Sequence, residues 1–220
     1  MTRRPFSYLA SRLAAQWRHH AKRFCRSDRG VAAVEAALVL PLMVFIIIGT
    51  IEVYQYFRAA TILDRTAHTL ASGISIQREL LDRGRCTEAI DICTYGAIAN
   101  DLTTPLDFSE RGSVVFSVYA ATEPRGKASQ PVSWEKTPTW RRGYGAAAQA
   151  QGTQPASRLD PPNGFPNANL GDTVLVVEVF YNFEPFALSA AFWEALGGER
   201  RIYSRAFFRP RFSDIRELGN

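Results

Sequence analysis

Histidine is scarce in this chain of 220 residues, and its scarcity restricts the chemistry that the protein can perform. Two of the three histidines, His19 and His20, lie in the first thirty residues, which leaves His68 alone in the remainder. A histidine-based triad or a zinc site with the usual number of ligands is therefore difficult to build. We expect no enzymatic activity, no cofactor and no metal site. We interpret His68 as an exposed helical residue, four positions after Asp64.

Acidic residues are nearly missing from the first thirty positions. This segment has a net charge of +7, and the rest of the chain carries −2, for a total of +5. Its basic residues are opposed by Asp28 alone, and they are Arg3, Arg4, Arg12, Arg18, Lys22, Arg23, Arg26 and Arg29. Because the remainder is nearly neutral, it offers no basic patch for phosphates, and we exclude nucleic acid as a partner. We interpret residues 1–30 as a basic cytoplasmic leader.

Long apolar runs are limited to one segment, from Val31 to Ile51, in which Glu35 is the only charged residue. As an α-helix this segment is about 30 Å long, enough to cross the hydrocarbon core of a bilayer. It is longer than the apolar region of a cleaved secretory signal. The positive charges before it place the N-terminus in the cytoplasm by the positive-inside rule. We therefore expect a single transmembrane helix at residues 31–51 and an exported domain from residue 52.

Two residues at the start of this segment suggest more than a plain anchor. Glu35 lies five positions into the apolar run, where a charge costs roughly 2.5 to 3.5 kcal/mol by insertion scales. Gly30 stands directly before Val31, and a glycine at this junction predicts an extended backbone that is accessible to a protease. Both residues therefore call for a functional explanation.

A glycine, a new N-terminus and a glutamate at the fifth mature position form the arrangement of type IV prepilins, which Gly30, Val31 and Glu35 match. Together with the sequence up to Ala60, this segment resembles the start of the TadE-like family. Members of that family are minor, pseudopilin-like components of the Tad (Flp) pilus machinery for tight adherence. The stretch from Asp172 to Arg211 resembles the family more loosely.

The resemblance implies a structural or assembly subunit of a Tad pilus in the bacterial inner membrane, with a periplasmic C-terminal domain. It implies cleavage between Gly30 and Val31 by a prepilin peptidase, and other pilins, pseudopilins and Tad assembly proteins as partners. Ala36 follows the glutamate where the major Flp pilins have tyrosine, and a large domain follows the span, so the resemblance is to a minor subunit. We expect the new ammonium of Val31 to pair with Glu35 of a neighbouring subunit.

Two other classes of protein are compatible with the same residues. One is a signal-anchored periplasmic enzyme or binding module unrelated to pili, which a convergent polar pocket in the exported domain would favour. The other is a bitopic scaffold that keeps its leader. Sequencing of the mature N-terminus separates both from a processed pilus subunit.

The exported domain is expected to be α+β, with a long N-terminal transmembrane and amphipathic helix and a pilin-like antiparallel β-sheet head at residues 84–220. The helix runs to about Ser75, within an extension at residues 52–83. Its apolar positions recur every three or four residues, at Tyr56, Ala60, Leu63, Ala67, Leu70 and Ile74. This stripe packs against the head or forms a coiled-coil seam with a partner. Alternating apolar residues predict strands at Ser113–Ala121, Thr173–Phe183 and Arg201–Arg209, and a short helix is expected at Pro185–Leu196.

Residues 122–171 differ in composition from their surroundings. They are rich in proline, glycine, glutamine and asparagine and have no sustained period, which predicts a flexible surface insertion. Trp134, Trp140 and Tyr144 lie within it. These aromatic residues either hold the insertion on the sheet or form a patch for a partner.

The three cysteines fall on two sides of the predicted span. Cys25 lies in the leader and should be removed with it, whereas Cys86 and Cys93 lie in the exported domain. Because the periplasm is oxidising, we expect a disulfide between Cys86 and Cys93. Two separate buried thiols are the alternative.

Overall fold

A computed structural model of the protein describes residues 28–122, 132–145, 157–185, 195, 201–211 and 215–219, with only the backbone of residues 28–30. The chain divides into two compact units, residues up to Ile51 and residues from Glu52 onward. The long helix α2, Asp28–Ser75, contributes residues to both.

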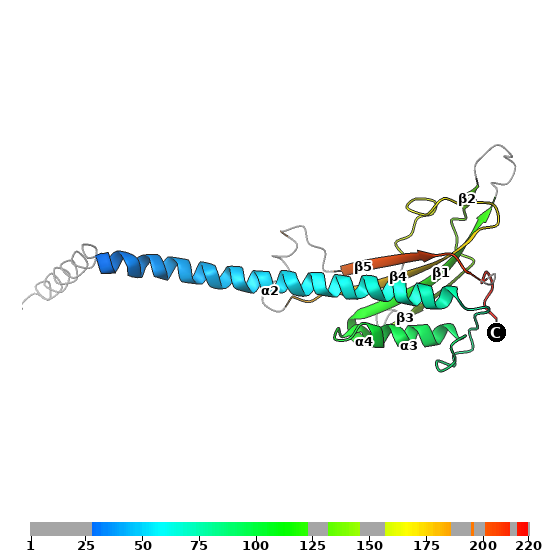
Figure 1. The fold of residues 1–220 in the computed structure, drawn as a ribbon, viewed down its shortest axis with the longest axis horizontal. Helices are drawn as coiled ribbons and strands as arrows, with labels where there is room; N and C mark the ends of the chain where they lie inside the picture. The colour runs from blue at the N-terminus through cyan, green and yellow to red at the C-terminus, as the bar shows by residue number, and fades with distance from the viewer. Residues whose placement is uncertain are drawn as a thin grey trace, which may run out of the picture. The chain divides into compact units, whose positions relative to one another are not determined.

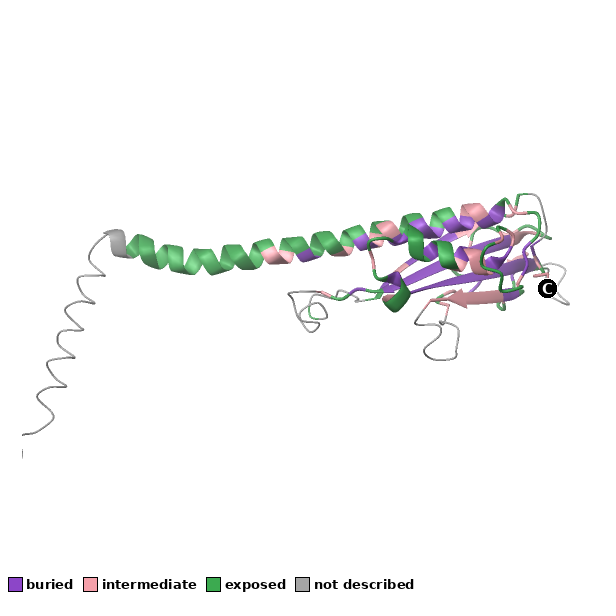
Figure 2. Cartoon of the chain, turned by 90° about the horizontal axis from the view of Figure 1, so that it is seen from below, coloured by how far each residue is buried: buried purple, intermediate pink, exposed green. Residues whose placement is uncertain are grey.

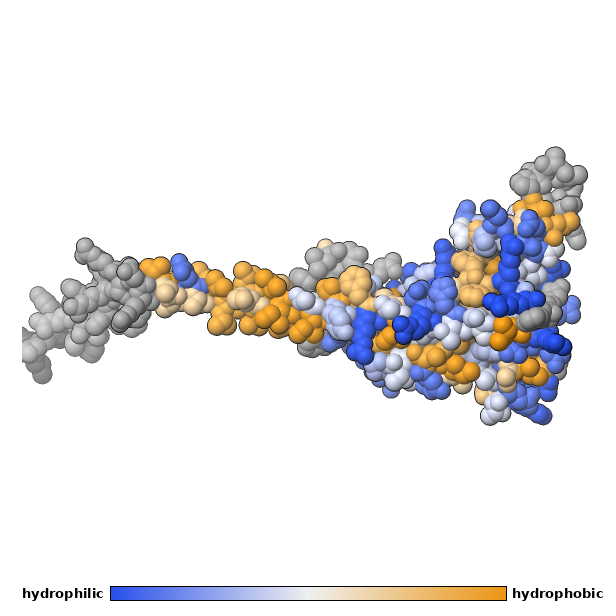
Figure 3. Space-filling model, viewed as in Figure 1, coloured by the Kyte–Doolittle hydropathy of each residue, from blue (hydrophilic) through white to orange (hydrophobic). Residues whose placement is uncertain are grey.

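The part of α2 that belongs to the first unit is the apolar segment. Its side chains are exposed from Val31 to Ile47, and Figure 3 shows this part of the helix as a largely hydrophobic surface. Among the described residues, α2 is the one helix that is long and apolar enough to cross a membrane. Such a surface is favourable in lipid, where the backbone hydrogen bonds of a helix are satisfied internally.

The second unit contains an antiparallel sheet of five strands among the described residues (Figure 1). The strands are β1 (Gly112–Thr122), β2 (Ser133–Trp134), β3 (Trp140–Tyr144), β4 (Thr173–Asn182) and β5 (Arg201–Phe208). β1 and β4 form the centre and β5 pairs with β4. β2 and β3 pair with successive parts of β1 on its other side. The α+β class and the three predicted strands are thus confirmed.

The C-terminal half of α2 packs on one face of this sheet. Leu63, Ala67, Leu70 and Ile74 of the predicted stripe are almost fully buried, and Tyr56 and Ala60 are partly buried. They share one core with inward-facing residues of β1, β4 and β5, as the buried side of the helix in Figure 2 illustrates. The apolar stripe therefore packs against the sheet of this chain, which was the first of the two predicted alternatives, and does not form a coiled-coil seam here.

The helix ends at Ser75, as expected, and residues 76–83 are not helical. The Ser75 carbonyl accepts a hydrogen bond from the backbone N–H of Arg211 at 2.9 Å, and the Ser75 hydroxyl donates to the carbonyl of Ser72. These contacts satisfy groups that a helix terminus leaves unpaired.

The second face of the sheet is also buried, which the sequence did not predict. The alternation in β1 predicted one buried face, but Val115, Ser117 and Tyr119 on the other face are buried as well. A second core forms there from Tyr119, Ala121, Trp134, Val174 and Val176, with Leu159, Phe165 and Ala168 packed against it. Residues from the segment 157–171 thus cover the face that was expected to be exposed.

Several elements were missed from the sequence. Helix α3, Ile92–Leu102, packs against the core through Ile92, Tyr95 and Ala99, and the short helix α4, Phe108–Arg111, precedes β1. β2 and β3 both lie in the segment expected to be an insertion without regular structure, and that expectation is wrong for these residues. β3 was not predicted because Arg141 and Arg142 interrupt the alternation of apolar residues in this strand. The helix expected at Pro185–Leu196 lies largely outside the described residues.

The aromatic residues of the same segment face the interior. The indole N–H of Trp134 donates to the carbonyl of Pro166 at 2.6 Å, and that of Trp140 donates to the carbonyl of Ile215 at 2.7 Å. Tyr144 is half-buried and packs against the first core. Their contacts support the structural interpretation, in which they hold connecting segments on the sheet.

Candidate membrane anchor and assembly site

The predicted processing site lies in the first turn of α2. The helix begins at Asp28, so Gly30 has helical backbone and the expectation of an extended junction is wrong. A glycine inside a helix costs only about 1 kcal/mol relative to alanine, so the helix extends through it.

Val31 and Glu35 lie one helical turn apart, and both side chains are exposed in the isolated chain. At this i, i+4 spacing they share one face of α2. The first residue of the apolar segment and its one charge therefore lie on the same exposed face of α2. Cys25, His19 and His20 lie outside the described residues.

Directly after the apolar segment, one face of α2 exposes large aromatic side chains. Tyr54 and Phe57 are each 64% exposed, and Arg58 and Arg65 lie on the same side of the helix. They line a shallow groove together with Thr61 and Ile62. Aromatic residues directly after an apolar span are typical of the interface between membrane and water.

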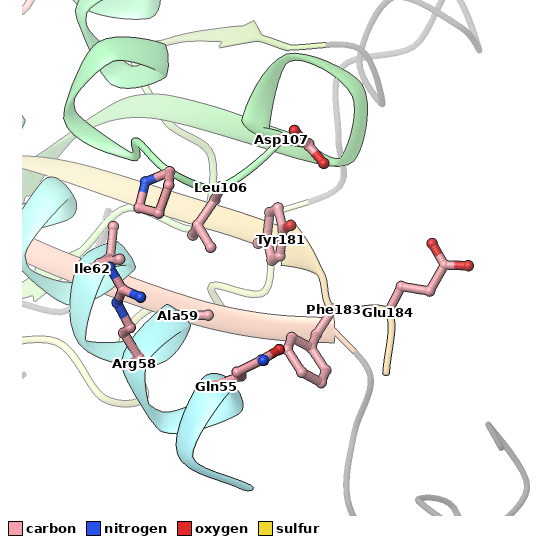
Figure 4. Close-up of a pocket in the computed structure, with 10 residues that line it drawn as sticks. Gln55, Arg58, Ala59, Ile62, Leu106, Asp107, Tyr181, Phe183 and Glu184 are labelled. Atoms are coloured by element: carbon pink, nitrogen blue, oxygen red, sulfur yellow. The ribbon is translucent and has the colours of Figure 1, made fainter. Parts of the chain in front are cut away.

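A pocket of about 250 Å³ opens next to this face, between α2, the segment before α4 and the end of β4 (Figure 4). Its walls are formed by Gln55, Arg58, Ala59, Ile62, Pro105, Leu106, Asp107, Tyr181, Phe183 and Glu184. Sequence reasoning missed it because its parts lie far apart in the chain. The aromatic and arginine residues that follow the span were the available signal.

The ionisable groups around the pocket differ in how they are partnered. Glu184 forms an ion pair with Arg111 at 2.7 Å. Burial raises the pKa of Tyr181, and the nearby Arg111 opposes this effect. The side chain of Asp107 makes no capping hydrogen bond to α4. The pocket thus combines one neutralised pair with separate charged groups.

His68, the one histidine after the apolar segment, lies on the surface of α2. His68 is exposed, as expected, and its ring lies at 72° to the ring of Phe208, with a centroid distance of 6.1 Å. Asp64 accepts a hydrogen bond from the hydroxyl of Ser204 at 2.9 Å. This bond joins α2 to β5 and gives Asp64 a structural role.

One carboxylate lies deep in the second core. Glu178 of β4 is fully buried, and its Oε1 accepts hydrogen bonds from the backbone N–H of Arg158 and from the hydroxyl of Tyr203. Burial, with Glu178 as the second cause, raises the pKa of Tyr203. These bonds tie the segment around Arg158 and strand β5 to β4.

Cys86 and Cys93 are joined by a disulfide, with their Cα atoms 4.8 Å apart. The Asp91 carboxylate lies inside the closed loop and accepts backbone hydrogen bonds from Arg83, Arg85 and Cys93. The last of these caps the N-terminus of α3. The disulfide and Asp91 therefore fix where this helix begins.

These features define a class of protein: an N-terminal apolar helix that fits a membrane anchor, continued by an α+β domain. Comparison with protein-family models narrows the class, because the model of the family described as TadE-like protein matches residues 30–72. The resemblance found in the sequence is confirmed over this segment, which includes Gly30, Val31 and Glu35. The looser resemblance of Asp172–Arg211 is not part of the match. No curated protein and no solved structure matches the chain.

Proposed function

We propose that the protein is a TadE-like minor pseudopilin, a membrane-anchored structural or assembly subunit of a Tad (Flp) pilus that serves tight adherence. The single observation that carries this proposal is the family match over residues 30–72. That segment contains the junction glycine, the glutamate at the fifth mature position and the whole apolar helix. An exported domain on a single anchor in the bacterial inner membrane is consistent with such a role.

In this proposal a prepilin peptidase cleaves between Gly30 and Val31. The cut removes the basic leader and leaves a free ammonium at Val31, one helical turn from Glu35. An isolated carboxylate in the span is costly, and an ammonium from an adjacent subunit offsets part of its desolvation. Pairing of Glu35 with the Val31 terminus of a neighbour would then set the axial register of two pilin helices.

N-terminal sequencing and intact-mass measurement on membranes from piliated cells test the processing step. We expect a mature chain that begins at Val31. A Gly30→Trp variant should accumulate as a longer precursor in the membrane, whereas Ala33→Trp, just beyond the junction, should still be cut. A full-length leader in cells with functional pili would refute the pseudopilin assignment.

The place of the subunit in the machinery is a separate question with its own assay. We expect the processed protein to cross-link to other pilins or pseudopilins and to Tad assembly proteins. Comparing its amount in sheared pili and in washed membranes distinguishes a subunit of the fibre from one that stays at its base.

A further inference from the structure

Two side chains of opposite charge line the pocket beside α2 without pairing with each other. Arg58 extends from α2, and Asp107 lies at the start of α4 on a different wall (Figure 4). The Asp107 side chain makes no capping hydrogen bond to α4, and its negative charge acts on the nearby hydroxyl of Tyr181. Glu184, which also lines the pocket, forms an ion pair with Arg111. Besides Glu184, the described lining of the pocket therefore offers Arg58 as a cation and Asp107 as an anion.

This arrangement restricts the chemistry of a ligand. An anionic group would be attracted to Arg58 but repelled by Asp107. A cationic group would be attracted to Asp107 but repelled by Arg58. A zwitterion whose two charges are separated by a short chain satisfies both residues. The volume of about 250 Å³ lies below the usual range of about 300 to 1,000 Å³ for pockets that enclose whole small molecules. A small polar headgroup fits this size better than a nucleotide or a sugar chain does.

The position of the pocket in the chain indicates where such a headgroup comes from. Gln55 and Arg58 follow the last residue of the apolar segment by four and seven positions, or about 6 and 10 Å of helix. The polar layer of a bilayer extends about 5 to 8 Å beyond its hydrocarbon core on each side. An arginine side chain can also reach several ångströms along a helix toward the interface. Lipid headgroups are thus the zwitterions nearest to Arg58.

We propose that the pocket binds the headgroup of a zwitterionic phospholipid, a phosphoethanolamine, from the outer leaflet of the membrane that holds the anchor. Arg58 pairs with the phosphate and Asp107 accepts hydrogen bonds from the primary ammonium. The exposed rings of Tyr54 and Phe57, beside Arg58, contact the glycerol and the upper acyl chains. This proposal rests on the membrane anchor and is independent of the role in a pilus.

Headgroup selectivity of the full-length protein tests the proposal. The protein is placed in nanodiscs that contain equal amounts of phosphatidylethanolamine, phosphatidylcholine and phosphatidylglycerol, and native mass spectrometry records which lipid stays bound after release. We expect phosphatidylethanolamine to be retained at least fivefold more than the other two. Phosphatidylcholine has the same charges, but its quaternary ammonium cannot donate a hydrogen bond to Asp107. Equal retention of the three lipids would overturn the proposal without any variant.

Two substitutions separate the roles of the charged residues. Arg58→Gln should lower retention of every phospholipid several-fold, because all of them carry the phosphate. Asp107→Asn should remove the preference for phosphatidylethanolamine while phosphatidylglycerol is retained as well as before or better. Arg78→Gln, an exposed arginine outside the pocket, is the matched control and should change nothing.

The main competing occupant is a charged side chain of a partner protein, and the same variants reveal it. A photo-reactive amino acid at Gln55 should cross-link to lipid. Cross-links to protein alone, lost in both Arg58→Gln and Asp107→Asn, would assign the pocket to a protein partner and refute the lipid site. Cleavage at Gly30 remains unchanged in these variants, so failure of this proposal is distinguishable from failure of the proposed function.

Discussion

Glu35 is the single residue whose chemistry is most at odds with its surroundings. Replacing it with alanine removes the only charge of the apolar segment and should make membrane insertion easier. We expect normal membrane levels and normal cleavage of Glu35→Ala, but a several-fold loss of cross-links to other pilins and of pilus output. Quantitative immunoblots of membranes and of sheared pili measure the two effects separately.

The control for Glu35 moves the charge instead of removing it. In Glu35→Ala combined with Val39→Glu, the carboxylate stays on the same face but lies one turn deeper. If any charge in the span suffices, this double variant should assemble as the natural sequence does. Full piliation by Glu35→Ala itself would show that the glutamate is merely tolerated near the interface.

Tyr144 gives the domain a measurable sensitivity to alkali. Burial, with Asp82 and Asp91 nearby, raises the pKa of Tyr144 to about 12 from its usual 10.0. The neutral phenol is therefore favoured in the folded state, so its contribution to stability is complete below pH 10 and is lost as the pH rises toward 12. The thermal midpoint of the protein in detergent should fall across this window. Tyr144→Phe keeps the ring and should show a shallower fall; an identical pH profile would contradict this assignment.

At the level of elements, helix α3 meets β3 through a contact that only glycine permits. A Cβ atom on Gly96 would lie 2.5 Å from Cγ of Tyr144, which is too close. Gly73 of α2 has more room, since its added Cβ would meet Cε1 of Tyr95 at 3.4 Å. Both substitutions to alanine gain up to about 1 kcal/mol of helix propensity. We expect Gly96→Ala to lower the free energy of unfolding by about 1 to 3 kcal/mol and Gly73→Ala to leave it unchanged or raise it.

Denaturant unfolding of the two glycine variants, followed by tryptophan fluorescence, measures the difference. Because both glycines are helical, the comparison isolates the steric contact from propensity. Equal stability of the two variants would mean that α3 and β3 can separate without cost.

The disulfide loop before α3 should contribute to stability mainly through the unfolded chain. Closing the loop between Cys86 and Cys93 stabilises by roughly 2 to 3 kcal/mol in the chain-entropy model. Reductant should lower the free energy of unfolding of the natural protein by about the same amount. The variant Cys86→Ser with Cys93→Ser should be insensitive to reductant, and labelling of two free thiols in the untreated mature protein would contradict the pairing.

The elements differed in how well the sequence revealed them. α2 was predictable because its stripe repeats over several turns, whereas β3 has five residues, two of them arginines. Arg141 donates hydrogen bonds to Ser117 and Tyr119 of the neighbouring strand, so its polarity is satisfied on the sheet and does not mark a loop. α3 had a usable signal, since Asp91 precedes apolar residues spaced by three and four positions.

For the molecule as a whole, the anchor could be predicted and the pocket could not. The anchor is one continuous segment whose length, apolar character and flanking charges act locally. The pocket joins residues near positions 58, 107 and 181, and only the packed sheet brings these together. The buried second face of the sheet was unpredictable for the same reason, because its cover comes from residues with no pattern of their own.

The apolar stripe of α2 and the strands that bury it lie far apart in the sequence, so they become available for folding at different times. Asp64 meets Ser204, 140 positions later, and Leu63 shares a core with Ile202 and Ala206. In the proposed topology, the machinery that exports the chain delivers the apolar stripe of α2 long before β4 and β5. During that interval the stripe has no sheet to rest on, so the domain should depend on periplasmic chaperones most strongly while its last third is still being translocated.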